Sequence, residues 1–248
     1  MKIILITLLF VCSTVNATEK VTVFQLGDDP DLKILLHCNE ETGDSMADDS
    51  GHGHTAVEEA GSVTLVSGGK FGGMADYDSG DMSEITKHAD FNTTTDFSVG
   101  YWVNLDVSPP AANSFIFLKI SDVGAYNWVL AIYSTGNVLW RIYGSFAGGF
   151  TGIYLNGDFS ANTWHYVVGT FNASTPITTV YVDGSSIGSD AEAGTRTNTD
   201  VDLHISGLVH ASPYGLIGQL DEIFYIDRCL SAAEIKEIYT KGQKVHVN

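Results

Sequence analysis

The chain consists largely of short apolar segments separated by glycine, asparagine and aspartate residues. Segments rich in β-branched and aromatic residues predict strands, and the polar residues between them predict turns, here at Ser134–Asn137, Asn156-Gly157 and Asp183-Gly184. About ten or more strands at this spacing favour two packed antiparallel sheets. The expected strands are Ile34–Cys38, Val63–Leu65, Met74–Tyr77, Ser98–Leu105, Ser114–Ile120, Trp128–Tyr133, Val138–Tyr143, Trp164–Asn172, Thr178–Val182, Val201–Ile205 and Leu220–Ile226.

Only the end of the chain has a convincing helical pattern, and it follows directly on the last expected strand. Ser231 and Glu234 have the spacing of a capping box, and Leu230 precedes them as one half of a hydrophobic staple with Ile235. Gly242 is expected to end the helix. The apolar face of this helix is formed by Ile235, Ile238 and Tyr239.

The charge of the chain excludes several classes of partner. Its 248 residues fit one large all-β domain and include 30 acidic against 12 Lys and Arg side chains, a formal net charge of −18. Phosphate groups would be repelled, so we expect no binding to nucleic acid or to anionic membrane surfaces. Solubility, neutral drift and cation binding each remain open as the reason for the acidity.

The first residues predict a secretory signal peptide. Lys2 precedes the apolar run Ile3–Val11, and Ala17 offers a small residue for cleavage. No later segment is long and apolar enough to predict a membrane span, so we expect a secreted, extracellular protein. The expected organisation is a signal peptide at 1–17, an N-terminal arm at 18–30, an all-β domain at 31–242 and a tail at 243–248.

Two cysteines and two sequons bear on covalent modification. Cys12 is expected to be removed with the signal peptide. Cys38 and Cys229 then remain as an even pair in an oxidising compartment. A disulfide between them is possible, although antiparallel pairing of the first and last strands would hold them too far apart. Asn92 and Asn172 lie in sequons that would carry glycans in a eukaryotic secretory pathway.

Six segments together carry a more specific signal. They are Ile34–Cys38, Asp48–His54, Gly68–Asp78, Phe97–Val103, Trp164–Phe171 and Val180–Gly184. In this order, and closed by the strand and helix described above, they resemble the laminin-G-like jelly-roll family of the concanavalin A-like lectin/glucanase superfamily. The resemblance covers about residues 34–242 and implies an all-β, two-sheet antiparallel jelly-roll sandwich with one short C-terminal helix. We expect Trp102 and Trp164 to fill the space between the sheets.

The resemblance also implies a structural calcium ion. Members of the family place it between the loop Asp48–His54 and the aspartate at the start of the last strand. Calcium binds several carboxylate and carbonyl oxygens, which a tight loop of this composition can supply. The candidate ligands for Ca2+ are Asp48, Asp49, the carbonyl groups of Gly51 and Gly53, and Asp221.

This chain departs from the family at two positions of that loop. His52 and His54 stand where the family has asparagine. Imidazole is a poor ligand for calcium and a good one for zinc or copper. A calcium site, a histidine-bound transition metal and a loop without metal therefore remain as alternatives.

A sugar-binding surface is the other candidate site. Sugars are bound by aromatic faces together with polar side chains that orient their hydroxyl groups. Along the strand Val138–Tyr143, Trp140 shares a face with Ile142 and is expected in the core, so that the opposite side is free for ligand. The candidate ligand-binding residues are Tyr126, Arg141, Tyr143, His210 and Tyr214.

These observations favour a secreted, non-catalytic recognition module that binds a glycan or a cell-surface or extracellular protein and is stabilised by calcium. One alternative is a structural coat, appendage or matrix protein that self-assembles as a homo-oligomer through its jelly roll. A second is a divergent polysaccharide hydrolase or lyase. No Glu-x-Asp-x-x-Glu segment brings two carboxylates to glycosidase spacing, which argues against catalysis.

Overall fold

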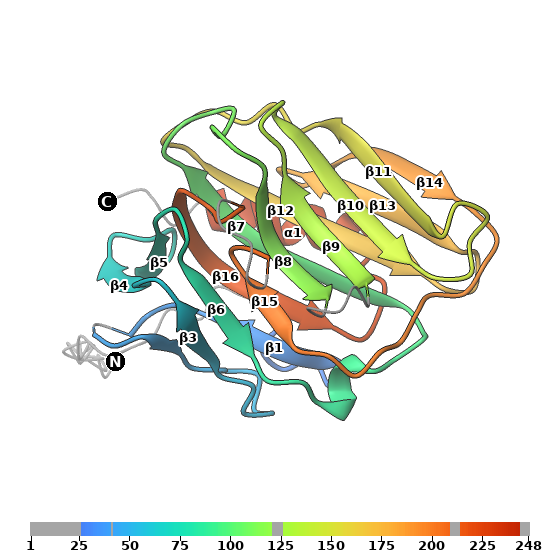
Figure 1. Ribbon diagram of the computed structural model, residues 1–248, viewed down its shortest axis with the longest axis horizontal. Helices are drawn as coiled ribbons and strands as arrows, with labels where there is room; N and C mark the ends of the chain where they lie inside the picture. Colours follow the sequence, from blue (N-terminus) through green and yellow to red (C-terminus); the bar gives the residue numbers. More distant parts are fainter. Residues whose placement is uncertain (1–25, 41, 121–125, 209–213, 244–248) are drawn as a thin grey trace, which may run out of the picture.

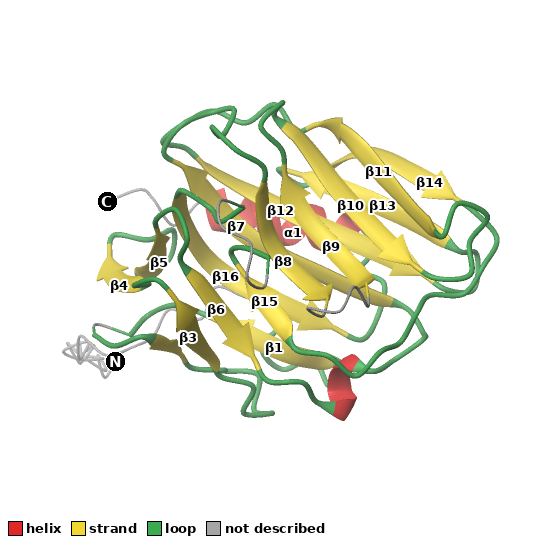
Figure 2. Ribbon diagram, viewed as in Figure 1, coloured by secondary structure: helices red, strands yellow, loops and turns green. Residues whose placement is uncertain are grey.

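A computed structural model describes residues 26–40, 42–120, 126–208 and 214–243. They form two antiparallel sheets packed face to face, with one α-helix on the outside (Figures 1 and 2). The predicted two-sheet antiparallel jelly-roll sandwich with a short C-terminal helix is therefore confirmed. The predicted signal peptide, the first part of the arm, His210 and most of the tail lie outside the described residues.

Sheet A contains the last strand of the chain at its centre, beside β7. In spatial order its strands are β14 (Ser185–Ala191), β13 (Ile177–Val182), β12 (Trp164–Asn172), β7 (Phe97–Leu105), β16 (Gly218–Ile226), β5 (Gly73–Tyr77) and β4 (Thr64–Ser67), and β1 (Leu32–Leu36) also pairs with β16.

Sheet B faces the viewer in Figure 1. In spatial order its strands are β11 (Phe150–Asn156), β10 (Asn137–Tyr143), β9 (Tyr126–Ile132), β8 (Ser114–Ile120), β15 (Leu203–Ile205), β6 (Met82–Ile85), β3 (Ala56–Ala60) and β2 (Ser45–Met46). A short 3-10 helix, η1 (Ala89–Phe91), lies between β6 and β7, and α1 (Ala232–Gln243) follows β16.

The expected strands are present, and the described residues contain five more that the sequence patterns missed: β2, β3, β6, β11 and β14. Four of these strands are short or carry mostly polar and small residues, so that their apolar alternation is weak. The other, β11, is an edge strand of sheet B whose last three residues are all exposed. The first strand is Leu32–Leu36 rather than Ile34–Cys38, and Cys38 has a left-handed φ of 52°. A strand cannot continue through that backbone conformation.

The strand β7 shows how both faces of sheet A become apolar. Phe97, Val99, Tyr101 and Val103 point into the core between the sheets. Trp102 points the other way and stacks on Tyr239 of α1 at 5.8 Å between ring centroids. The expectation that Trp102 and Trp164 lie between the sheets is therefore wrong, since both pack in the cluster beneath the helix. Strict alternation along the strand is the reason.

The helix α1 begins as predicted. The backbone N–H of Ser231 donates to Glu234 Oε2 at 2.8 Å, and the N–H of Glu234 donates to Ser231 Oγ at 3.3 Å, which is a capping box. Leu230 and Ile235 are both buried in the cluster beneath the helix, as the staple predicts. The prediction that Gly242 ends the helix is wrong, because the helix continues to Gln243.

Gly242 instead permits close packing of the helix on the sheet. A Cβ atom at this position would lie 2.6 Å from Cζ2 of Trp102 and 3.0 Å from Cζ of Phe71. Only glycine leaves room for the two rings. Leu26 is buried in the same cluster, and Asp29 forms an ion pair with Arg228 at 2.7 Å, so the described end of the predicted arm is docked on the domain.

Core-facing and helix-facing side chains do not alternate regularly along the last strand, β16, because the strand contains a β-bulge. The register of β16 against β7 shifts between Asp221 and Phe224, and Glu222 has a left-handed φ of 52°. Leu220 and Ile223 consequently both face the core, whereas Phe224 packs beneath the helix. A bulge inserts one extra residue and so reverses the pattern on one side of it.

The possible disulfide is not formed. Cys38 and Cys229 are both free thiols. The strands β1 and β16 pair antiparallel, with Leu36 opposite Ile223 and Leu32 opposite Ile226. Cys38 therefore follows one end of the pair and Cys229 follows the other, well beyond the roughly 6 Å between Cα atoms that a disulfide needs.

No helix among the described residues has the length and apolar character needed to cross a lipid bilayer.

Candidate functional site

The outer face of sheet B carries an apolar surface that no described helix covers, because α1 packs on the opposite side of the sandwich (Figure 2). Its buried floor consists of Leu118, Ile120, Val129, Ala131 and Leu139, with Phe115, Tyr133, Tyr143 and Leu208 packed against them. We call this surface the open face. Aromatic side chains that remain partly exposed above such a floor are suited to binding a ligand.

One part of the open face brings together three of the predicted ligand-binding residues. Trp140 and Ile142 are fully buried in the core, which confirms the prediction for Trp140 and turns Arg141 and Tyr143 outward. The rings of Tyr126 and Tyr143 stack at 5.0 Å between centroids, and 47% of Tyr126 is exposed.

The guanidinium group of Arg141 lies over an aromatic ring that the sequence patterns did not reveal. Its Cζ atom is 3.9 Å from the ring centroid of Phe150 on β11 and 6.0 Å from that of Tyr143. Gly152 stands opposite Arg141, and a Cβ atom there would lie 2.9 Å from Cα of Arg141. The glycine therefore permits the close approach of β10 and β11 at this position. Recognising Phe150–Asn156 as a strand that pairs with β10 would have placed Phe150 opposite Tyr143, next to Arg141.

The guanidinium group of Arg141 keeps hydrogen-bonding capacity. Its buried Nε atom has no hydrogen-bond partner in the part of the chain that the structure describes. Arginine binds carboxylates with paired N–H donors and stacks on aromatic faces at the same time. Arg141 is a half-buried cation on an aromatic surface that is itself partly exposed.

A second aromatic group lies beside the first. Tyr214 contacts Phe115 at 5.6 Å, Phe115 contacts Tyr133 at 6.0 Å, and Tyr133 contacts Tyr154 at 5.1 Å between ring centroids. Burial raises the pKa of Tyr133, and the nearby charge of Arg141 partly opposes this shift. Tyr154 is 44% exposed and Tyr214 is 36% exposed.

The predicted calcium loop is held together by Asp48. Its carboxylate accepts hydrogen bonds from the backbone N–H groups of Leu35 at 3.0 Å, Ser50 at 2.9 Å and His54 at 2.8 Å. Burial alone would raise the pKa of Asp48, but these donors outweigh it and hold the pKa below its usual value. Asp49 lies 3.8 Å from His37, measured between Oδ2 and Nε2.

The structure separates Asp48 from Asp221. Asp48 forms a β-bridge with Leu36, and Leu36 pairs with Ile223 of β16. The strand β1 therefore lies between the loop and the last strand, and two strand spacings amount to about 10 Å. Gly51 and Gly53 adopt left-handed φ values of 88° and 80° in the loop. Shared calcium ligation by this set remains a prediction.

Asp221 is fully buried on the helix side of sheet A, opposite Trp102 in β7. One carboxylate oxygen, Oδ2, accepts the backbone N–H of Phe71 at 2.9 Å, whereas Oδ1 finds no partner among the described residues. Burial, followed by the charge of Glu222, raises the pKa of Asp221 well above its usual value. An unpartnered buried carboxylate oxygen has the chemistry that a hard cation satisfies.

The described residues form two groups of side chains with the atom types and spacing of metal ligands. One consists of His52, His54 and Asp90, and the other of Glu59, Glu84 and His204. Neither contains Asp48 or Asp221. The sequence singled out His52 and His54, but the third member, Asp90, comes from η1 and has no motif to mark it.

The two sequons differ in how their side chains are engaged. The amide group of Asn92 donates to Asp200 at 2.8 Å, and its carbonyl oxygen accepts from Lys119 at 2.5 Å. Asn172 uses its carbonyl oxygen in a local turn, where it accepts the N–H and the hydroxyl of Ser174. Glycosylation at either position remains a prediction.

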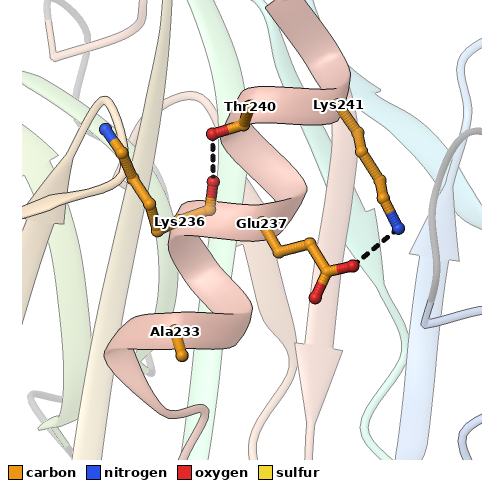
Figure 3. A pocket seen from close by; sticks show the side chains of 5 residues that line it. All are labelled: Ala233, Lys236, Glu237, Thr240 and Lys241. Atoms are coloured by element: carbon orange, nitrogen blue, oxygen red, sulfur yellow. Dashed lines mark hydrogen bonds and ion pairs between the residues drawn. The ribbon is translucent and has the colours of Figure 1, made fainter.

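A depression on the surface of α1 does not form a comparable site. Figure 3 shows that its lining side chains all come from this helix. Lys241 pairs with Glu237 at 2.7 Å, and the hydroxyl of Thr240 donates to the carbonyl of Lys236 at 2.7 Å. These contacts satisfy the polar groups within the helix itself. The lining residues are Ala233, Lys236, Glu237, Thr240 and Lys241.

Comparison with known protein families shows which superfamily the chain belongs to. The family model of the concanavalin A-like lectin/glucanases superfamily matches residues 78–236, which is more than half of the chain. The chain belongs to this superfamily. The region matched by the family model includes β7, the hairpin β12–β13 and the last strand, β16. Segments of the same elements carry the resemblance seen in the sequence of this concanavalin A-like chain.

Individual relatives of this concanavalin A-like domain are distant. It is 22% identical over 224 residues to the "Non-toxic nonhemagglutinin" of Paraclostridium bifermentans. The aligned residues cover 89% of this chain and 18% of that protein. It shares its fold with the binding domain of Paraclostridial Mosquitocidal Protein 1, with a TM-score of 0.66 and 16% identity over 87% of this chain and 52% of that chain.

A further solved structure is the binding domain of botulinum neurotoxin DC in complex with SialylT. It shares the fold with a TM-score of 0.62 and 14% identity over 90% of this chain and 53% of that chain. The concanavalin A-like domain therefore spans about half the length of these solved binding domains and less than a fifth of the curated relative.

Proposed function

We propose that this chain is a secreted, non-catalytic recognition module that binds a glycan through the open face of sheet B. The observation that carries the proposal is the position of Arg141, which lies 3.9 Å above Phe150 beside the stacked pair Tyr126 and Tyr143. Aromatic rings bind the apolar faces of sugars, and a neighbouring arginine binds a carboxylate or hydroxyl group.

The ligand class that fits best is an acidic glycan, because the guanidinium group of Arg141 beside these aromatic rings attracts a negatively charged group. Support from the relatives is indirect: a binding domain of the same fold has been solved in complex with SialylT. The absence of a paired-carboxylate motif in the sequence supports a non-catalytic role.

A glycan array with sialylated and neutral members tests this proposal. The protein should bind sialylated glycans in preference to their neutral counterparts, and Arg141→Ala should weaken that binding at least about tenfold, which corresponds to one charge-assisted contact of about 1.5–3 kcal/mol. Lys241→Ala removes an exposed cation from α1 and serves as the control. An array without hits, or equal binding by Arg141→Ala, would contradict the proposal.

Binding to a protein surface or to a second copy of the chain is the competing use of the open face. Tyr126 and Tyr154 on the open face are 47% and 44% exposed, which is the kind of apolar surface that such partners cover. Sedimentation analysis separates the cases. A monomer that binds glycans supports the proposal, whereas a regular oligomer without glycan binding favours self-assembly.

A bound calcium ion is a separate part of the proposal. The unpartnered Oδ1 of the buried Asp221 supports it, together with the buried Glu222 Oε2, which also lacks a partner among the described residues. Calcium at this position would stiffen the strand–loop junction beneath α1. The test is a rise in the thermal unfolding midpoint with calcium that Asp221→Asn abolishes.

A further inference from the structure

Three histidines converge on a single carboxylate oxygen at one end of the sandwich. Asp90 Oδ2 lies 2.8 Å from Nε2 of His54, 3.2 Å from Nδ1 of His52 and 3.3 Å from Nδ1 of His88. The histidines come from the loop Asp48–His54 and from the residue that precedes η1. We call this group the histidine cluster.

We infer that the histidine cluster is a binding site for a divalent transition metal of the zinc class, with His52, His54 and Asp90 as ligands. The ligand atoms of these three residues all lie within 4.8 Å of one another. Around a tetrahedral zinc ion with bonds of about 2.0–2.1 Å, neighbouring ligand atoms lie about 3.3 Å apart. The observed separations from Asp90 Oδ2 differ from that value by a few tenths of an ångström.

The chemistry of the donor set selects the metal class. Imidazole nitrogen binds zinc, copper and nickel, whereas calcium and magnesium prefer sites built from oxygen. The inferred site is therefore distinct from the calcium site proposed at Asp221, which offers carboxylate oxygens only.

Two of the three ligands are held in place without metal. His54 is 8% exposed, its ring packs edge-on against Phe91 at 4.6 Å, and its backbone N–H is fixed by Asp48. Asp90 is part of η1, and its backbone N–H donates to Nδ1 of His88 at 3.2 Å. Ligands held by their surroundings need little rearrangement on binding.

The remaining ligand can move, and the site is accessible. The side chain of His52 is 34% exposed and lies between Gly51 and Gly53. The side chain of His88 beside the three ligands is 53% exposed, and its Nδ1 accepts the N–H of Asp90. The ion would join the loop Asp48–His54 to η1, whose Phe91 packs on Tyr225 of β16 at 5.7 Å.

Titration of the purified, tag-free protein with zinc chloride after treatment with a chelator tests the inference. Isothermal calorimetry should show one high-affinity equivalent, and the unfolding midpoint should rise by several degrees, because an ion that binds only the folded state stabilises it. The cobalt-substituted protein should show the visible absorption of a tetrahedral nitrogen and oxygen site.

Single substitutions locate the ion. His52→Ala should weaken zinc binding at least about tenfold while the circular dichroism spectrum stays unchanged, because this side chain is exposed. Asp49→Asn alters a neighbouring acid of the same loop outside the histidine cluster and should leave the zinc affinity unchanged. Asp221→Asn should likewise leave it unchanged, which separates this site from the proposed calcium site. Absence of stoichiometric zinc binding, or binding that survives His52→Ala, would overturn the inference.

Discussion

The outer faces of the two sheets differ in a way that relates directly to function. On sheet A, Trp102 and its apolar neighbours are covered by α1 and by Leu26, so that this face is a second core. On sheet B, Arg141 and its aromatic neighbours remain partly exposed above an apolar floor. Both faces follow from the same alternation of side chains along strands. Only the covering helix makes one face structural and leaves the other available for a ligand.

The charged residues of the two faces show the same contrast. Asp221 on the covered face has no exposed surface and a strongly raised pKa. Arg141 on the open face retains contact with solvent and lies over Phe150. A buried charge is costly unless it is paired, whereas an exposed one can meet a ligand without that cost.

Replacement of the largest side chain on the covered face gives the sharpest test of this contrast. Trp102→Ala should lower the free energy of unfolding by about 3–5 kcal/mol, because it opens a cavity beneath α1. Tyr154→Ala on the open face should cost less than about 1 kcal/mol. Urea denaturation measures both. Similar losses for the two variants would show that the open face is also part of the stabilising core.

Gly242→Ala tests how closely the covering helix must approach. Alanine would favour the helix by about 1 kcal/mol, but its Cβ would lie 2.6 Å from the ring of Trp102, and overpacking costs about 1–3 kcal/mol. We expect a net loss of up to about 2 kcal/mol in urea denaturation. Thr240→Ala on the exposed side of α1 should change stability by less than about 0.5 kcal/mol. A stabilised Gly242→Ala variant would contradict the close packing.

The buried Asp221 should make stability depend on pH in the absence of metal. Its pKa is raised in the folded state, so above about pH 4 the folded chain holds a proton that the unfolded chain has lost. The free energy of unfolding should therefore fall as the pH rises towards the folded pKa, by at most about 1.4 kcal/mol per pH unit.

Denaturation in chelator at about pH 4, 5.5 and 7 measures this slope. The contribution should disappear in Asp221→Asn, and calcium should reduce it in the unsubstituted protein by holding the carboxylate ionised. An equal slope for the unsubstituted protein and for Asp221→Asn would assign the effect to other groups.

The smallest expected effect concerns the start of the covering helix. Ser231→Ala removes the side-chain acceptor for the N–H of Glu234 and should cost about 1 kcal/mol in urea denaturation. Ser231→Thr keeps a hydroxyl group at the cap and should restore most of that loss. If alanine and threonine are equally tolerated, the capping box does not hold α1 on the covered face.

Local patterns predicted much of the fold because their physical causes are local. The capping box of Ser231 and Glu234, the burial of Trp140 and the turn at Asp183-Gly184 each depend on residues a few positions apart. The same reasoning brought Tyr126, Arg141 and Tyr143 together, since strand alternation and turn positions determine which side chains share a face. Strands of weak apolar character, such as β14, were missed because their neighbours determine their pairing.

What the sequence by itself determined is the class of fold: apolar strands, turn residues and a capped terminal helix leave few alternatives to a two-sheet sandwich. Only the tertiary structure decided which outer face the helix covers, that Phe150 lies beneath Arg141, and that Asp90 joins His52 and His54. These contacts join residues far apart in the chain. Their distances depend on strand order and register, and no spacing along a single sequence encodes those directly.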